Sequence, residues 1–244
     1  YMPPMPIADP KRSLQLLQPQ VDALNRDIRA ISPQQWGQPS SCHGWQVADL
    51  VAHVVRNGWS MLAFLQRALA GDPTPPFGPG VLPIQEAVKA SGPQASANRQ
   101  ERETREFIEL GASLTPDQLA IISHTHPVGP WPLSWACTQR LLEVAYHHWD
   151  LRASFGDAGP LDHELAAYLL TFQFDPASKP AIDAPNRPEG TPSETFRLHS
   201  TTDGVTYRVS ATAQGLRTES NGQGQPPAAE VSAEAGWLAL AVYG

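Results

Sequence analysis

Residues 13–32 have the sequence SLQLLQPQVDALNRDIRAIS, in which apolar side chains recur at alternating steps of three and four residues. The apolar positions are Leu14, Leu17, Val21, Leu24, Ile28 and Ile31. Because an α-helix turns once every 3.6 residues, these side chains form one stripe along an amphipathic helix. The dipeptide Ser32-Pro33 ends that helix. The pattern therefore predicts a helix that packs its apolar face against other elements.

Four further segments show helical patterns, at about 47–69, 91–114, 133–155 and 162–174. In the first of them Leu50, Val54, Met61 and Leu65 are expected to face inward. Five prolines between residues 73 and 83 predict a loop after this helix. Thr115-Pro116 is typical of a short helix start, with threonine as the cap and proline in the first turn.

The periodicity changes after a second group of prolines, which extends from Pro176 to Pro192. Beyond it apolar residues alternate with polar ones around Phe196 and again around Tyr207, and residues 202–204 between them resemble a hairpin turn. Residues 235–243 form a short apolar helix at the end. We therefore expect an α+β protein: a helical bundle over residues 1–175, a proline-rich linker over 176–192, and a small α+β domain over 193–244.

Composition excludes several classes of function. The 244 residues have a formal net charge of −7 and no cluster of Lys and Arg, which argues against nucleic-acid binding. No apolar run approaches the ~20 residues of a membrane span, and the start lacks a secretory pattern. Two cysteines cannot form a disulfide scaffold. Phosphate-binding glycine motifs and the nucleophile elbow are also missing. A soluble cytoplasmic protein is expected.

Three side chains that the helices can bring together are candidate metal ligands. Glu143 and His147 are four residues apart, so they lie about 40° apart on one helix face and can bind one metal ion. His53 lies three residues after Leu50, on the apolar side of its helix. Together the three residues offer two imidazoles and one carboxylate, which leaves coordination positions open for a reactant. One alternative is that Glu143 and His147 belong to a polar stripe, extended by Arg140 and Asp150, that faces water. The other is that His53 is an ordinary hydrogen-bonded core residue.

The remaining histidines and cysteines have less informative positions. His124 and His126 form an H-x-H pair that proline and glycine place in a loop, which makes a second metal site there the weaker alternative. His148 points about 100° away from His147. We expect it to pack against neighbouring side chains or to hold a metal ligand in position. We expect a surface position for His43, His163 and His199, and a small buried role for Cys42 and Cys137.

Two segments resemble the signatures of one family. Residues 39–53, PSSCHGWQVADLVAH, resemble the segment P-x-x-C-x-G-W-x-V-x-D-L-x-A-H of the mycothiol-dependent maleylpyruvate isomerases. Residues 143–151, EVAYHHWDL, resemble that family's second signature, E-x-x-x-H-x-W-D-L. The resemblance implies a DinB-like four-helix bundle followed by a small α+β C-terminal domain.

The resemblance also implies a site and a reaction. By position, the family's metal ligands correspond to His53, Glu143 and His147, and its usual metal is zinc, with nickel or other divalent ions in related proteins. The family uses a low-molecular-weight thiol of the mycothiol type. As a thiolate it adds to an activated double bond of a small electrophile. Rotation and elimination then isomerise that bond, whereas S-transfer stops after addition.

In the family an arginine of the C-terminal domain helps to bind the substrate carboxylate. Relatives commonly carry Gly-Arg after the last apolar helix, whereas the present sequence reaches Tyr243-Gly244. Arg197, Arg208 and Arg217 are the arginines of the expected C-terminal domain. None of the three is singled out by its sequence context.

Three classes of function thus stay open. The first is a thiol-dependent isomerase or S-transferase whose partners are a small thiol and a small electrophile. The second is a metal-dependent hydrolase on the same bundle, in which the ion activates water. The third is a non-catalytic metal-binding protein of the stress response.

Overall fold

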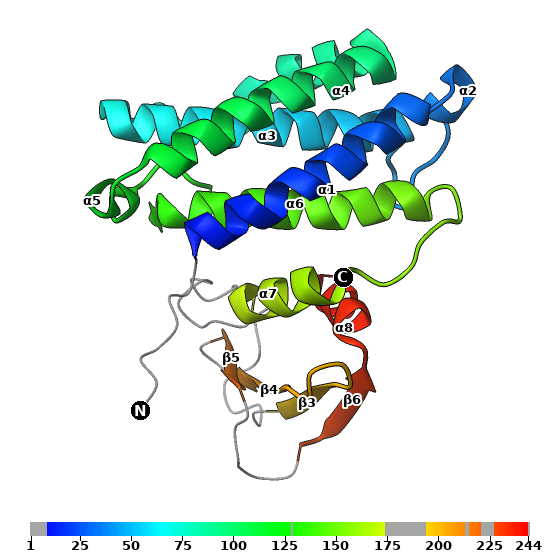
Figure 1. Cartoon of the computed structure of the whole chain (residues 1–244), viewed down its shortest axis with the longest axis vertical. Helices are drawn as coiled ribbons and strands as arrows, with labels where there is room; N and C mark the ends of the chain where they lie inside the picture. Colours follow the sequence, from blue (N-terminus) through cyan, green and yellow to red (C-terminus); the bar gives the residue numbers. More distant parts are fainter. Residues whose placement is uncertain (1–8, 128, 174–193, 213–214, 221–226, 244) are drawn as a thin grey trace. The chain divides into compact units, whose positions relative to one another are not determined.

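The computed structural model describes residues 9–127, 129–173, 194–212, 215–220 and 227–243 (Figure 1). They fall into two compact units, one within Ala8–Gly159 and the other from Pro160 onward. None of the helices in these described residues combines the length and the apolar character that a membrane span requires.

Four long helices build the first unit. They are α1 (Pro10–Ala30), α3 (Val47–Ala70), α4 (Leu82–Ser113) and α6 (Ser134–Ala153). α1 packs against α4 and α6, and α3 packs against the same two helices. Each helix therefore has two neighbours in a closed ring, and Figure 1 shows the four ribbons stacked in this way. The predicted four-helix bundle is confirmed.

Short elements connect the long helices. They are α2 (Pro33–Trp36), the 3₁₀ turn η1 (Pro79–Val81), α5 (Pro116–Leu119), and an antiparallel strand pair, β1 (Ile122–Ser123) with β2 (Trp131–Pro132). α5 begins as its sequence predicts: the Thr115 hydroxyl accepts a hydrogen bond from the backbone N–H of Gln118.

α4 begins earlier than expected, at Leu82 rather than near residue 91. The five prolines between residues 73 and 83 predicted a loop over this whole stretch. The last of them, Pro83, lies instead in the first turn of α4, where proline is compatible with the helix. The break comes instead at Gly92, whose φ of 78° interrupts the helical backbone before Pro93. A residue without Cβ adopts this left-handed conformation at little cost, so α4 consists of two helical segments.

The apolar stripe of α1 lies in the bundle core, where Leu17 and Ile28 have no exposed surface. The core also contains a polar residue, Arg140 of α6, which is fully buried. Its Nη1 donates to the backbone oxygen of Val54 at 3.0 Å and to Asn57 Oδ1 at 2.8 Å. A Cβ atom at Gly58 would lie 2.9 Å from Arg140 Nη2, so glycine in the middle of α3 makes room for the guanidinium.

The second unit combines two helices with a four-stranded sheet. The helices are α7 (His163–Gln173) and α8 (Ala235–Tyr243), and the strands are β3 (Glu194–Ser200), β4 (Thr206–Thr212), β5 (Gly215–Ser220) and β6 (Ala229–Ala233). The strand order is β5-β4-β3-β6. β3 and β4 form the expected antiparallel hairpin, with Phe196 opposite Val209, and β6 runs parallel to β3. The predicted change from helical to strand periodicity is confirmed.

The division between the units differs from the expected domain boundary at residue 175. The structure assigns α7 to the second unit, where it packs against α8. Leu169 and Leu170 of α7 and Leu238 of α8 are buried. A Cβ at Gly236 would meet the backbone of Leu161, so this glycine permits a close approach within the unit. The proposed linker, residues 176–192, lies outside the described residues.

Candidate metal centre

His53 of α3 and the pair Glu143 and His147 of α6 meet between two packed helices. His53 Nε2 lies 3.3 Å from Glu143 Oε2, and His147 Nε2 lies 3.5 Å from the same oxygen. The candidate ligand atoms of all three residues lie within 4.8 Å of one another. The sequence predicted that Glu143 and His147 share one face of α6 and that His53 lies on the apolar side of α3. The structure brings the three side chains together.

Burial and charge act in opposite directions on this group. Burial lowers the pKa of His53, although its hydrogen bond with Glu143 works against that shift. Burial also disfavours the charged form of Glu143, but the hydrogen bond with His53 and the charges of His147 and Arg140 hold its pKa below the ordinary value. A neutral imidazole and an ionised carboxylate are the protonation states in which these side chains bind a metal.

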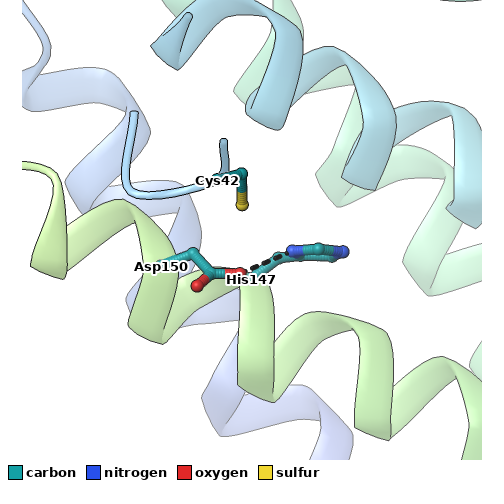
Figure 2. A group of neighbouring side chains, drawn as sticks. All are labelled: Cys42, His147 and Asp150. Atoms are coloured by element: carbon teal, nitrogen blue, oxygen red, sulfur yellow. Dashed lines mark hydrogen bonds and ion pairs between the residues drawn. The ribbon is translucent and has the colours of Figure 1, made fainter. Parts of the chain in front are cut away.

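Asp150 fixes the orientation of His147 (Figure 2). Its Oδ2 lies 2.9 Å from His147 Nδ1, and its side chain is largely buried. A carboxylate only accepts hydrogen bonds, so it favours the tautomer with the hydrogen on Nδ1. The lone pair of Nε2 then points toward Glu143, and a histidine held by a carboxylate in this way is a common metal ligand.

Cys42 lies beside the same pair, in the segment before α3 (Figure 2). Its sulfur, a His147 nitrogen and an Asp150 oxygen form a second group of possible ligands within 4.8 Å. Burial, together with the charge of Asp150 and a hydrogen bond to it, raises the pKa of the thiol to about 12. Cys42 therefore stays protonated and donates to Asp150. It is half-buried, whereas the sequence predicted a buried packing residue.

Neighbouring side chains complete the surroundings of the three residues. Gln139 Nε2 donates to the other carboxylate oxygen of Glu143 at 3.2 Å, and Arg56 Nη2 lies 3.0 Å from His53 Nδ1. The Trp45 ring lies 5.0 Å from the His53 ring and 6.3 Å from the His147 ring, measured between centroids. Trp45, from the first signature, thus borders both imidazoles.

Sequence reasoning did not assign roles to Arg56, Gln139 or Asp150. The available signal was spacing: each lies three or four residues from a candidate ligand on the same helix, as His53-x-x-Arg56, Gln139-x-x-x-Glu143 and His147-x-x-Asp150 do. Spacing shows that two side chains share a face but does not show which atoms meet.

The other histidines take different positions. His148 Nε2 lies 2.7 Å from Asp27 Oδ2 of α1, so His148 packs away from the group, as predicted. His126 stacks on Trp131 with ring centroids 3.6 Å apart, and burial lowers its pKa to about 4. In the described part of the chain neither His124 nor His126 joins a group of possible metal ligands. The alternative that the polar stripe of α6 faces water is wrong, because Arg140, His147 and Asp150 are buried.

The role of Asp150 can be tested with a matched control. Asp150→Ala removes the carboxylate at His147 Nδ1, and we expect zinc affinity to fall between about 10- and 100-fold, as for comparable supporting residues. Asp27→Ala removes the equivalent carboxylate at His148 and should leave the affinity unchanged. Competition with a chromogenic chelator measures both. Equal affinities in the two variants would show that Asp150 does not support the site.

Comparisons with known proteins agree with this architecture. The family model described as the mycothiol maleylpyruvate isomerase N-terminal domain matches residues 17–152. No curated protein sequence gives a significant match. The chain is similar to a crystal structure of the mycothiol-dependent maleylpyruvate isomerase, with TM-score 0.67 and 19% identity, over 96% of this chain and 88% of that one. A structure of a histidine-to-alanine mutant of that enzyme has the same TM-score and coverage at 18% identity.

The two structural likenesses show the fold, which extends over both units. The family match is independent of them and covers all the residues placed around His53, Glu143 and His147. It also covers more than half of the chain. The chain therefore belongs to the mycothiol maleylpyruvate isomerase N-terminal domain family.

Proposed function

We propose that this protein is a metal-dependent enzyme that uses a low-molecular-weight thiol of the mycothiol type on a small electrophilic substrate. The reaction is isomerisation of a double bond, as the names of the similar structures suggest, or S-transfer to the same class of substrate. The observation that carries the proposal is the convergence of His53, Glu143 and His147, with Asp150 directing the Nε2 lone pair of His147 toward the other two.

The donor set fits a divalent ion such as zinc. Two imidazole nitrogens and one carboxylate oxygen are typical zinc ligands, and three protein ligands leave a position open for a reactant. When bound there, the ion would stabilise the deprotonated sulfur of a thiol at neutral pH.

The residues of the chain would bind the ion, orient its ligands and border the site. His53, Glu143 and His147 would hold the ion, and Asp150 holds the hydrogen on His147 Nδ1. Gln139 orients Glu143 by donating to its other oxygen. The Trp45 ring borders the two imidazoles and offers them an apolar surface.

The chemistry requires no other reactant. In isomerisation, the thiolate forms a carbon–sulfur bond to one alkene carbon, and the electron pair moves to the adjacent activating carbonyl. Rotation about the resulting single bond and cleavage of the carbon–sulfur bond restore the alkene and the thiolate. The thiol is therefore not consumed. In S-transfer, protonation of the adduct ends the reaction and one thiol is consumed.

Thiol binding tests the proposal directly. A ligand at 100 times its Kd stabilises the folded protein by about 2.7 kcal/mol, which corresponds to a rise in Tm of about 5–10 °C for a protein of this size. We expect mycothiol, bacillithiol or glutathione to give such a rise with the zinc-loaded protein. The S-methyl derivative of the same thiol is the matched control and should give none. Equal stabilisation by both compounds would contradict a role for the sulfur.

A further inference from the structure

Arg56 and His53 form a contact that determines the tautomer of His53. Arg56 Nη2 lies 3.0 Å from His53 Nδ1. A guanidinium has only donors, so Nδ1 must be the acceptor. In a neutral ring the hydrogen then lies on Nε2, which faces Glu143 Oε2 at 3.3 Å. With Arg56 as the donor at Nδ1, His53 accepts from Arg56 and donates to Glu143 through Nε2–H.

This contact is incompatible with His53 as a ligand through Nε2. Binding an ion uses the lone pair of Nε2, so a neutral ring carries its hydrogen on Nδ1 instead. Nδ1–H and the guanidinium N–H groups are then both donors, and no hydrogen bond can join them. Arg56 must therefore give up this contact when His53 binds an ion.

Arg56 released in this way keeps a positive charge next to the site. It lies one turn from His53 on the same face of α3 and is half-buried. Its Nε is buried and has no hydrogen-bond partner among the described residues. A planar guanidinium with unused donors matches the two oxygens of a carboxylate, which it binds through paired hydrogen bonds.

The structure gives less support for carboxylate binding by the arginines of the second unit. Arg197 Nη1 lies 3.0 Å from Glu230 Oε2, so its charge is already paired. The Arg217 side chain lies outside the described residues. Arg56, by contrast, contacts a candidate ligand directly.

We propose that Arg56 binds a carboxylate of the small electrophilic substrate, and that ion binding by His53 frees it for this role. The inference rests on the proposed function, because it requires His53 to bind an ion. It adds a residue that selects anionic substrates, and it makes substrate binding depend on metal loading.

Calorimetric titration with maleate, without thiol, tests the carboxylate contact. We expect Arg56→Gln to weaken maleate binding to the zinc-loaded protein at least about tenfold, since one charged hydrogen-bonding contact is worth about 1.5–3 kcal/mol. Arg56→Lys should recover part of the loss, because lysine supplies the charge without the paired donors. Arg67→Gln, on the same helix but bonded to the backbone oxygen of Thr74, should bind maleate like the wild type. Maleamide, the uncharged diamide, should bind the wild type and Arg56→Gln equally.

Nitrogen NMR of the His53 ring tests the release. We expect the ring hydrogen on Nε2 in the zinc-free protein and on Nδ1 after zinc is added. Wild-type affinity for maleate in Arg56→Gln, or a hydrogen on Nδ1 without zinc, would overturn the inference and leave the proposed function standing. If Arg56→Gln instead weakens zinc binding and not maleate binding, Arg56 supports Glu143, and the inference is again wrong. A wild-type protein that binds no zinc would overturn both proposals.

Discussion

We expect His147→Ala to lose the divalent ion that the wild-type protein should bind, whereas His148→Ala should retain it. Structural zinc sites with four ligands bind with roughly 10–16 kcal/mol, so one ligand contributes on the order of 3 kcal/mol, or more than 100-fold in affinity. His147 Nε2 lies 3.5 Å from Glu143 Oε2, whereas His148 Nε2 lies 2.7 Å from Asp27 Oδ2 on another helix. Metal content after dialysis against a weak chelator, measured by mass spectrometry, distinguishes the two variants.

The adjacent histidines make this comparison a sharp one. Both are largely buried on α6, and each pairs with an aspartate, so both substitutions remove a buried imidazole together with its partner's contact. Circular dichroism should show similar helix content in the two variants. Equal loss of metal from both would mean that the ion is not held by His147.

Much of the bundle could be predicted because its helices carry regular apolar stripes. The spacing from Leu14 to Ile31 predicts both the existence of α1 and its buried face, and α8 has the predicted bounds. The hairpin of β3 and β4 follows from alternation and a turn. In each case the signal is local, because neighbouring side chains in the sequence show which face is apolar.

The parts that the sequence did not predict depend on contacts between distant residues. The apolar face of α7 could have packed against either unit, and only the folded chain shows α8 as its partner. Glycine is a poor helix former, and the sequence around Gly58 does not explain its presence in the middle of α3. The explanation is Arg140, 82 positions away in the sequence, whose guanidinium occupies the space that a side chain at Gly58 would need. For the candidate ligands the sequence and the resemblance predicted the residues, whereas the Asp150 and Arg56 contacts depend on ring orientation, which spacing does not determine. That His53, Glu143 and His147 bind an ion stays a prediction.

Turnover should require zinc and a thiol together. A free thiol with a pKa near 8.5 is only about 3% thiolate at pH 7, so full deprotonation accounts for roughly 30-fold in rate. Holding the sulfur beside the substrate contributes more, because well-oriented reactants avoid much of the entropic barrier. We therefore expect isomerisation of maleylpyruvate to fall on the order of 1000-fold when either zinc or the thiol is omitted. The appearance of the trans isomer, followed by proton NMR, gives the rate.

The histidine variants and an ester substrate separate the possible reactions. His147→Ala should show the background rate even with thiol and zinc present, whereas His148→Ala should retain most of the wild-type rate, because Asp27 and not the site is its partner. Thiol recovered unchanged after many turnovers indicates isomerisation, and its consumption in proportion to product indicates S-transfer. If zinc-loaded protein instead cleaves a nitrophenyl ester at full rate without thiol, and His147→Ala abolishes that cleavage, the three side chains serve a hydrolase and the sulfur has no part in the reaction.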